Sequence, residues 1–576
     1  MLNQWALLRR PGDEAPSSRS SGFNSGRAPP AHTGDYSCRA THLDPSLWVH
    51  VPANGSKPFV VLPTPSEGSH SDGYRLLVNA GQPICVRVVV PPTISKNAFE
   101  ASSKQITQLY QPIAGSPGMW DSVILDAVGA KTGASVPISL HPIRHLNMAE
   151  RDAVHVYEGE LRLYDSDVFT LAGTLEYREA KWNYEPPATE PFEYKPEPVG
   201  VPDNAHIEVA VPQTSPHHIN NYLNLPLCRQ SDEPGRWLPQ SSLPFTAESQ
   251  SLPTVQGRVW LPYRCRLKGY SYSAFLQCLD TNRPMSPDRG ETYTIHWFGD
   301  TNTRRSLKKI TSLGKWCSGG HSNKQFCECD DSGEVFSRFT GQNSVRDTLL
   351  LLNDEDGGWS TMENGEPQSR KVEGPLTRIY YHRWEGLTIF NGGDWKVTFD
   401  GSNIGKYPRA DLVVVSLSTM DAAFAPFLEY TRALNQLIEF LKQHYDERTI
   451  VLRSPQYFCC TAPGGSPLRR VQKDRNRLYG EYTKRLFEHH FKSLVHIWDV
   501  SSIAEGLPLD QRKDMAKCVI NSVPSDMVDV ENHVLFNGLC NAEPFEGGDA
   551  SEDSIEAILP ALAAHKKLRT DSRELS

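Results

Sequence analysis

Hydrophobic residues in the C-terminal half of the chain alternate between two periods. Continuous apolar runs at residues 295–298, 412–415 and 449–452 are typical of buried strands, and a further strand is predicted over 495–500. Between them, residues 426–445 and 474–491 place apolar side chains three and four positions apart, which predicts amphipathic helices. Strands that alternate with helices predict a parallel sheet covered on both faces. We therefore expect a three-layer α/β domain over residues 291–565.

The N-terminal half has a different pattern. Short β-rich runs separated by polar turns occur at residues 59–62, 85–90, 154–157, 161–163 and 175–177. This pattern is typical of an all-β sandwich, and we predict one of the immunoglobulin-like kind over residues 46–187. The expected fold class is thus α/β, with an all-β sandwich domain ahead of the parallel-sheet domain.

Three remaining segments lack this patterning. Residues 1–45 are rich in Ser, Gly, Pro and Arg without apolar periodicity, so we expect them to be disordered. Residues 188–290 begin with closely spaced prolines and are interpreted as a linker followed by a lead-in or cap region. Trp237 and Trp260 are interpreted there as packing anchors, with carbohydrate stacking as the alternative. Residues 566–576 form a polar tail.

A Gly-Asp turn separates the strand at 295–298 from the next helical pattern. Gly299 and Asp300 precede Thr301, whose hydroxyl would then lie at the start of a helix. Unpaired backbone N–H groups and the positive end of the helix dipole stabilise a developing oxyanion at such a position. The layout predicts a nucleophile site at the carboxyl edge of the sheet. The alternative is that Asp300 and Thr301 are ordinary helix caps.

Composition limits the classes of function. The chain has 576 residues, enough for two to four domains, and 38% hydrophobic with 22% charged residues is ordinary for a globular protein. The formal net charge of -9 argues against a nucleic-acid binder. No run approaches the roughly 20 apolar residues needed to span a bilayer. The first eight residues lack a signal-peptide pattern, because their short apolar run precedes the basic pair Arg9 and Arg10.

The twelve cysteines permit disulfides, and their spacing does not suit a zinc site. No glycine-rich loop with a phosphate-binding lysine occurs, so we expect no metal, nucleotide or flavin cofactor. The sequon that begins at Asn54, together with the cysteines, favours a secretory compartment.

Several motifs resemble one known family. The Gly-Asp-Thr-Asn-Thr-Arg run at residues 299–304 resembles the Gly-Asp-Ser-x-x-Arg block of SGNH-type esterases and polysaccharide O-acetyltransferases. The Gly-Arg-Trp at 235–237, the Trp-Leu-Pro-Tyr-Arg-Cys at 260–265 and the Cys-Leu at 278–279 are similar to landmarks of the PC-esterase group. Some members of that group carry a neurexophilin-like β domain. The resemblance covers residues 230–545 and implies an acylated glycan as partner, an acyl donor, and a secretory or extracellular location.

A hydroxyl nucleophile needs a base and an acid that orients the base. The resemblance implies His533 as the base, with Asp529 as the orienting acid and Asp526 in reserve. The family spaces these residues as Asp-x-x-His, whereas Asp529 and His533 are separated by three residues. A structural histidine is the alternative for His533.

Two differences from the family fall at positions that would take part in catalysis. Thr301 replaces the usual Ser, and its extra methyl group restricts the attacking oxygen. After the strand at 412–415, related enzymes place a Gly and an Asn or His that help to bind the oxyanion, whereas this chain has Ser418. Arg304, Asn391 and Gly392 are the remaining expected support residues. Two hypotheses follow: a glycan O-acetyl esterase or O-acetyltransferase, and a non-catalytic glycan-binding or scaffold protein with a degenerate site.

Overall fold

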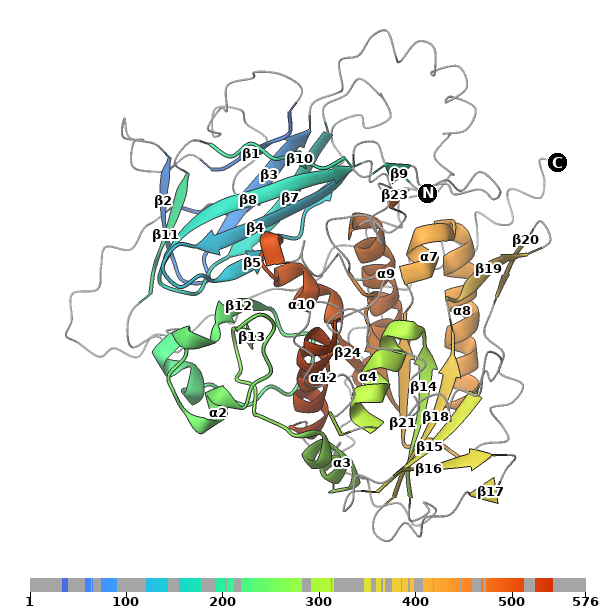
Figure 1. The fold of residues 1–576 in the computed structure, drawn as a ribbon. Helices are drawn as coiled ribbons and strands as arrows, with labels where there is room; N and C mark the ends of the chain where they lie inside the picture. Colours follow the sequence, from blue (N-terminus) through green and yellow to red (C-terminus); the bar gives the residue numbers. More distant parts are fainter. Residues whose placement is uncertain are drawn as a thin grey trace, which may run out of the picture. The chain divides into compact units, whose positions relative to one another are not determined.

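A computed structural model of the whole chain was analysed (Figure 1). It describes residues 34–39, 57–63, 65, 74–90, 121–142, 155–177, 192–193, 195–202, 205–211, 219–281, 292–311, 313–314, 347–353, 359–363, 366–367, 376–384, 386–391, 394–397, 408–417, 419–445, 448–457, 468–469, 473–511 and 524–541. All of these belong to one compact unit, residues 29–542. Of residues 1–45, which were expected to be disordered, the structure describes 34–39, where Tyr36 is buried and Cys38 forms a disulfide with Cys85. The polar tail lies outside the described residues.

The C-terminal half is built on an eight-stranded sheet in the order β17-β16-β15-β18-β14-β21-β22-β24, which we call the parallel sheet. Strands β18, β14, β21, β22 and β24 run parallel, and β15 is antiparallel to β18. The predicted strands at 295–298, 412–415 and 449–452 are confirmed as parts of this core. The strand predicted at 495–500 is confirmed for 495–498, and Val500 instead begins a helix, α10. The strands are β14 (Thr292–Gly299), β15 (Asp347–Asn353), β16 (Trp359–Glu363), β17 (Glu366–Pro367), β18 (Leu376–Arg383), β21 (Leu412–Ser416), β22 (Thr449–Arg453) and β24 (Val495–Trp498).

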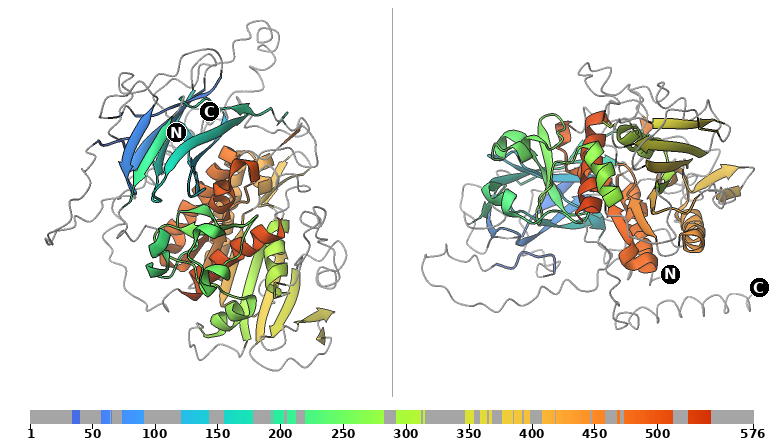
Figure 2. Two further views of the ribbon diagram at one scale, coloured as in Figure 1. Left: turned by 60° about the vertical axis from the view of Figure 1, so that its left-hand side comes forward. Right: turned by 90° about the horizontal axis from the view of Figure 1, so that it is seen from below.

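Helices cover both faces of the parallel sheet (Figures 1 and 2). Neighbouring residues of β14 point to opposite faces, so Phe298 joins the core under α7, α8 and α9, and Trp297 joins the core under α3, α4 and α12. The predicted helices at 426–445 and 474–491 are confirmed as α8 and α9. The helices are α3 (Tyr272–Thr281), α4 (Thr301–Thr311), α7 (Thr419–Phe424), α8 (Phe427–His444), α9 (Lys473–Phe491) and α12 (Ser525–Cys540).

Two further sheets form most of the N-terminal half. One has the order β1-β3-β7-β6 and the other β13-β12-β5-β4-β8-β11-β2, with β10 paired to β8. The second sheet includes β10 to β13, so it continues into the range expected to be linker and cap. The strands are β1 (Phe59–Val61), β2 (Arg75–Asn79), β3 (Pro83–Val90), β4 (Ser122–Gly129), β5 (Ser135–Pro137), β6 (His141–Pro142), β7 (His155–Arg162), β8 (Val168–Tyr177), β10 (Glu197–Pro198), β11 (His206–Ala210), β12 (Gly235–Pro239) and β13 (Arg258–Pro262).

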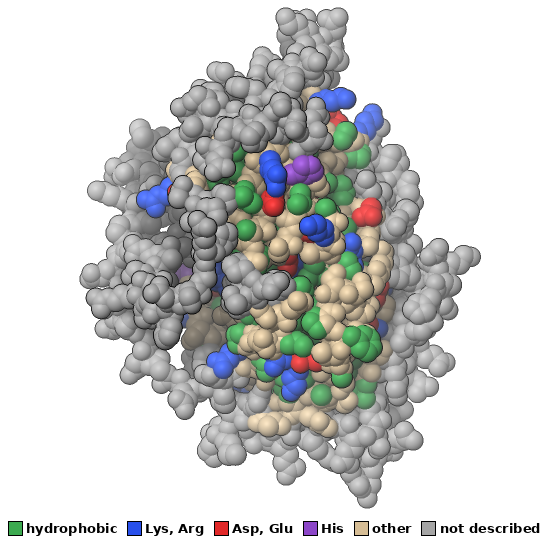
Figure 3. Space-filling view, turned by 90° about the vertical axis from the view of Figure 1, so that its left-hand side faces the viewer, with side chains coloured by type: hydrophobic (Ala, Val, Ile, Leu, Met, Phe, Trp, Pro, Cys, Tyr) green, Lys and Arg blue, Asp and Glu red, His purple; other side chains and the backbone are tan. Residues whose placement is uncertain are grey.

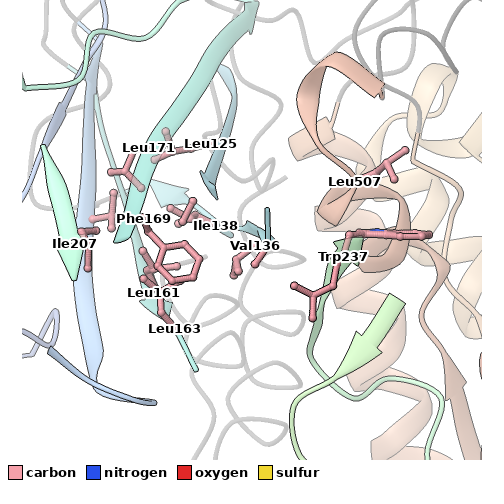
Figure 4. Close-up of a cluster of buried hydrophobic side chains, with 14 of the residues drawn as sticks. Leu125, Val136, Ile138, Leu161, Leu163, Phe169, Leu171, Ile207, Trp237 and Leu507 are labelled. Carbon is pink, nitrogen blue, oxygen red and sulfur yellow. The ribbon is translucent and has the colours of Figure 1, made fainter. Parts of the chain in front are cut away.

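A hydrophobic core joins these sheets to later parts of the chain (Figure 4). Phe169 and Val136 belong to the same cluster as Trp237 and Leu507. Trp237 and Trp260 are 0% and 3% exposed, which fits packing anchors. The remaining elements are η3 (Ile219–Asn224), η4 (Gln240–Ser242), α2 (Ala247–Gln250), α10 (Val500–Gly506), η7 (Lys492–Leu494), the pair β19 (Thr388–Asn391) and β20 (Asp394–Val397), and the pair β9 (Phe192–Glu193) and β23 (Leu468–Arg469).

Three disulfides occur among the described cysteines, Cys38–Cys85, Cys228–Cys265 and Cys278–Cys540. The last one ties α3 to the end of α12 across 262 residues of sequence. The mixed α/β fold with a parallel sheet is thus as predicted from the sequence. The immunoglobulin-like character of the N-terminal sheets and the domain boundaries remain predictions.

Candidate active site

The Gly-Asp turn lies where the sequence predicted it. Strand β14 ends at Gly299, and α4 begins at Thr301. The Oδ1 atom of Asp300 accepts the backbone N–H groups of Asn302 and Thr303 at 3.0 and 3.2 Å, so Asp300 caps the helix. The helix position of Thr301 is therefore described, although its side chain is outside the described part of the structure. The turn therefore places Thr301 at the carboxyl edge of the parallel sheet.

Two groups of contacts hold the turn in place. A Cβ atom on Gly299 would lie 2.3 Å from the Cγ2 of Thr303 and 2.6 Å from the Cβ of Ser416, so no larger residue fits. The hydroxyl of Tyr381 donates to the carbonyl oxygens of Gly299 and Asp300 at 3.1 and 3.2 Å. The backbone N–H of Trp384 also donates to the carbonyl of Gly299, at 2.8 Å. The strand-to-helix turn is therefore fixed from both neighbouring strands.

Polar side chains continue from this turn across the ends of the parallel strands. Strand register places Gly299, Ser416, Arg453 and Trp498 in one row. The alternation of side chains places this row on the sheet face covered by α4 and α12, because Trp297, Val414 and Val451 belong to the core on that face. Ser416 is 4% exposed, and its hydroxyl has no hydrogen-bond partner in the part of the chain that the structure describes.

A buried ion pair links this row to α12. The Nη2 atom of Arg453 lies 2.9 Å from the Oε2 of Glu531 and donates to Oε1 of Gln456 at 2.6 Å. The guanidinium also lies over the ring of Trp498. Burial raises the pKa of Glu531, Arg453 and Gln456 oppose that rise, and the charge of Asp300 adds to it. Asp300 and Glu531 are therefore close enough to interact, and α12 is anchored above the strand ends.

His533 is buried in α12, one residue after Asn532. Burial lowers the pKa of its imidazole to about 4, and a hydrogen bond with the backbone of Lys268 partly offsets that effect. The Nε2 atom has no hydrogen-bond partner among the described residues. A neutral imidazole with a free ring nitrogen is the form that a base requires. Its protonation state thus fits the predicted role.

The position of His533 fits that role less well. Asn532 donates to the carbonyl of Ser306 at 3.2 Å, and Asp529 accepts from Lys309 at 2.9 Å, so α12 runs antiparallel to α4. One residue corresponds to about 100° around a helix, which turns His533 away from the face that carries Asn532. Thr301 lies five residues before Ser306, about 7.5 Å further along α4. The imidazole of His533 makes its hydrogen bond to the backbone of Lys268.

The two candidate orienting acids have other partners. Asp529 accepts hydrogen bonds from the hydroxyl of Tyr272 at 2.6 Å and from Nζ of Lys309 at 2.9 Å, and it thereby joins α12 to α3 and α4. Asp526 lies in the first turn of α12, and burial raises its pKa to about 6. Neither acid makes a described hydrogen bond to His533. The predicted Thr301, His533 and Asp529 set therefore remains a prediction.

The expected support residues divide into two groups. Arg304 is half-buried in the first turn of α4, and its backbone N–H donates to the carbonyl of Asp300 at 3.0 Å. Asn391 ends β19, and its side chain is not described. Gly392 and Ser418 lie outside the described residues. Sequence reasoning did not find Tyr381, Ser416, Arg453 and Glu531, which lie on four separate elements. Only the position of Ser416 and Arg453 at the ends of apolar runs could have indicated them.

One group of possible metal ligands occurs among the described residues. The ligand atoms of Cys38, Cys85 and Glu158 lie within 4.8 Å of one another. Because the two cysteines form a disulfide, their sulfur atoms are not available as thiolate ligands.

The surface and the helices bear on possible partners. On the described part of the face in Figure 3, hydrophobic, basic and acidic side chains are interspersed. Within the described residues, no helix has both the length and the apolar character needed to cross a bilayer.

Comparisons with known proteins add little to this geometry. No protein-family model and no curated protein matches the chain. Among solved structures, the chain is similar to a candidate arylesterase from Agrobacterium tumefaciens str. C58, with 11% identity and a TM-score of 0.22. The match covers 42% of this chain and 96% of that chain. A TM-score this low supports no inference about the activity of this protein.

Proposed function

We propose that this protein is an SGNH-like glycan O-acetyl esterase or O-acetyltransferase that uses the hydroxyl of Thr301. The observation that carries the proposal is the turn at Gly299 and Asp300, which ends a parallel strand and opens α4 at the carboxyl edge of the sheet. Sites of open α/β sheets form at this edge. The three disulfides support a secretory or extracellular location, which is where an acylated glycan would be met.

The proposed chemistry follows from the place of Thr301 at the start of α4. Thr301 attacks the carbonyl carbon of an acyl ester, and a base accepts its proton. Because Asp300 already accepts the N–H groups of Asn302 and Thr303, the backbone N–H of Thr301 and the positive end of the α4 dipole stabilise the oxyanion. The base returns its proton to the leaving alcohol as an acyl-enzyme forms. Water or a sugar hydroxyl then accepts the acyl group. His533 is the proposed base; the hydrogen bond of its imidazole to the backbone of Lys268 is the described contact that this role would have to accommodate.

A second candidate is favoured by one specific observation. His533 is fully buried, and its imidazole is hydrogen-bonded to the backbone of Lys268. Asp529 already accepts hydrogen bonds from Tyr272 and Lys309. If this arrangement persists when a ligand binds, the fold is retained without a working base. The protein would then be a non-catalytic glycan-binding or scaffold protein.

Release of acetate separates the two candidates. The purified chain is incubated with 4-nitrophenyl acetate and with an acetylated oligosaccharide mixture. We compare the wild type with Thr301→Ala, Thr301→Ser and His533→Ala. The esterase proposal expects Thr301→Ala to lower turnover by about 10³-fold or more, and His533→Ala to lower it similarly. Thr301→Ser should keep or increase the activity.

Ser306→Ala is the matched control, because Ser306 is another buried hydroxyl of the same helix, in its middle rather than at its start. It should leave turnover unchanged. Wild-type turnover no higher than that of Thr301→Ala would reject the enzyme and favour the non-catalytic candidate. Binding of the oligosaccharides by the wild type without turnover would support that candidate.

A further inference from the structure

The segments that follow the two neighbours of β14 are joined by one buried carboxylate. Asp421 lies in α7, shortly after β21 ends, and is 2% exposed. Its Oδ2 atom accepts the backbone N–H of Leu387 at 2.7 Å, and its Oδ1 atom accepts the backbone N–H and the hydroxyl of Thr388 at 3.0 and 2.8 Å. Both donors belong to the segment that leads from β18 into β19, which we call the β18–β19 segment and which is described at residues 384 and 386–388. Because β14 lies between β18 and β21, this contact joins the two sides of β14 at its carboxyl end.

The β18–β19 segment also contacts the turn that carries Thr301. The backbone N–H of Trp384 donates to the carbonyl of Gly299 at 2.8 Å, directly after the pairing of β18 with β14 ends. The indole ring of Trp384 packs on Phe298, with the ring centroids 4.6 Å apart. The segment is therefore bonded to the turn at its first residue and to Asp421 at its last two residues.

Electrostatics and backbone geometry agree with this close approach. Burial raises the pKa of Asp421 to about 6, the hydrogen bonds from Leu387 and Thr388 oppose that rise, and the charge of Asp300 adds to it. Asp421 and Asp300 are therefore close enough to interact. Gly386 has a φ of 152°, and a Cβ atom on it would lie 3.0 Å from Oδ1 of Asp421. A residue with a side chain would be strained there and would press on the carboxylate.

Helix α7 is itself held in place, which makes it a fixed support for this contact. The guanidinium of Arg475 in α9 donates to the carbonyl oxygens of Ala422 and Ala425. The hydroxyl of Tyr479 donates to the carbonyl of Ala425 at 2.7 Å. All of these groups are buried. A carboxylate with three donors on a fixed helix restrains the β18–β19 segment well, because hydrogen bonds to an ionised group are stronger than those between neutral groups.

We propose that Asp421 is a positioning residue for the acyl chemistry of Thr301. It holds the β18–β19 segment across the carboxyl end of β14, and Trp384 passes this restraint to the turn through the carbonyl of Gly299. The inference rests on the proposed function, because the restraint affects turnover only if Thr301 reacts. The role requires no contact between Asp421 and the ester, since the carboxylate acts by keeping the nucleophile where attack is productive.

A matched carboxylate occurs in the N-terminal half. Asp167 is buried, and it accepts the backbone N–H groups of Lys131 and Thr132 at 2.9 and 2.7 Å and the hydroxyl of Thr132 at 2.6 Å. It thus fixes a loop with the same kinds of donors, but beside β8, which belongs to a different sheet from β14. Asp167→Asn therefore controls for the loss of a loop contact as such.

Steady-state kinetics with 4-nitrophenyl acetate at pH 8 test the proposal. Asp421→Asn keeps the size of the side chain but replaces one acceptor oxygen with an NH2 group, so Leu387 or Thr388 loses its bond. We expect kcat to fall by about 10²-fold, the effect of a displacement of about 1 Å, with KM changed by less than about twofold. Asp167→Asn should keep the wild-type kcat.

A second variant covers the case in which Asp421→Asn does not fold. Gly386→Ala alters the same contact from the β18–β19 segment and should lower kcat in the same way. Unchanged kcat in the folded variant, with turnover by the wild type, overturns this inference and leaves the proposed function in place. An equal loss of kcat in Asp167→Asn overturns it as well. Wild-type turnover no higher than that of Thr301→Ala rejects the proposed function, and this inference falls with it.

Discussion

Helix α8 and the helix pair α4 and α12, on opposite faces of the parallel sheet, are held by different interactions. Helix α8 buries only Tyr and aliphatic side chains against the sheet. Helices α4 and α12 on the opposite face bury many polar side chains, which are Asn302, Thr303, Arg305, Ser306, Lys308, Lys309 and Thr311 of α4 and Glu531, Asn532, His533 and Asn537 of α12.

Burial of apolar surface alone explains α8, whereas polar groups are costly to bury unless each has a partner. The contacts of α4 and α12 therefore depend on hydrogen bonds and ion pairs, such as those of Lys309 with Asp529 and of Arg453 with Glu531.

The largest effect is expected from breaking the ion pair between Arg453 and Glu531, which anchors α12. Glu531→Ala leaves the fully buried guanidinium of Arg453 without its carboxylate, and we expect a loss of about 3–5 kcal/mol in the free energy of unfolding. Urea denaturation measures it. The double variant Arg453→Met with Glu531→Leu should lose less than the single variant, because no charge remains unpaired. A single-variant loss below about 1 kcal/mol would contradict the anchoring role.

The second test compares the layers directly. Leu437→Ala removes a fully buried side chain of α8 and should cost about 3 kcal/mol, within the usual range of 2–5. Ser306→Ala removes a buried hydroxyl of α4 that has no described partner, so it should change the free energy of unfolding by less than about 1 kcal/mol. Equal losses from the two variants would mean that α8 and α4 are packed in the same way.

The third test uses the pH dependence of His533. Its pKa falls from 6.5 to about 4 on folding, so the stability tied to the neutral imidazole is complete above pH 6.5 and is lost as the pH falls toward 4. In His533→Gln, this loss is absent. The wild type should lose about 2 kcal/mol more than the variant between pH 8 and pH 5, measured by urea denaturation at both values. Parallel pH profiles would show that His533 does not resist protonation in the folded protein.

The smallest expected effect concerns the turn itself. Tyr381→Phe removes the hydroxyl that bonds to the carbonyls of Gly299 and Asp300, and should cost about 1 kcal/mol. Hydrogen exchange should rise at the Asn302 and Thr303 amides, which Asp300 caps, and stay unchanged in α8. An equal rise in both helices would indicate global destabilisation instead of a loosened turn.

Much of the α/β half could be predicted because its signals are local. Residues 295–298 and 412–415 are apolar runs of strand length, and the stripe of α8 repeats at helical spacing. The start of α4 was also predictable, since Gly299 and Asp300 have turn and cap preferences of their own. The continuation of an N-terminal sheet into β12 and β13 was not, because pairing between strands far apart in sequence leaves no local pattern.

The sequence by itself determined the strand, the turn and the helix that place Thr301, because backbone preferences and apolar spacing act within a few residues. Only the tertiary structure decided the neighbours of that turn. Tyr381 and Ser416 reach it through strand register, and α12 directs the hydrogen bond of the His533 imidazole to Lys268. Those positions depend on how separate elements pack, and a single shifted register or helix rotation would change each of them.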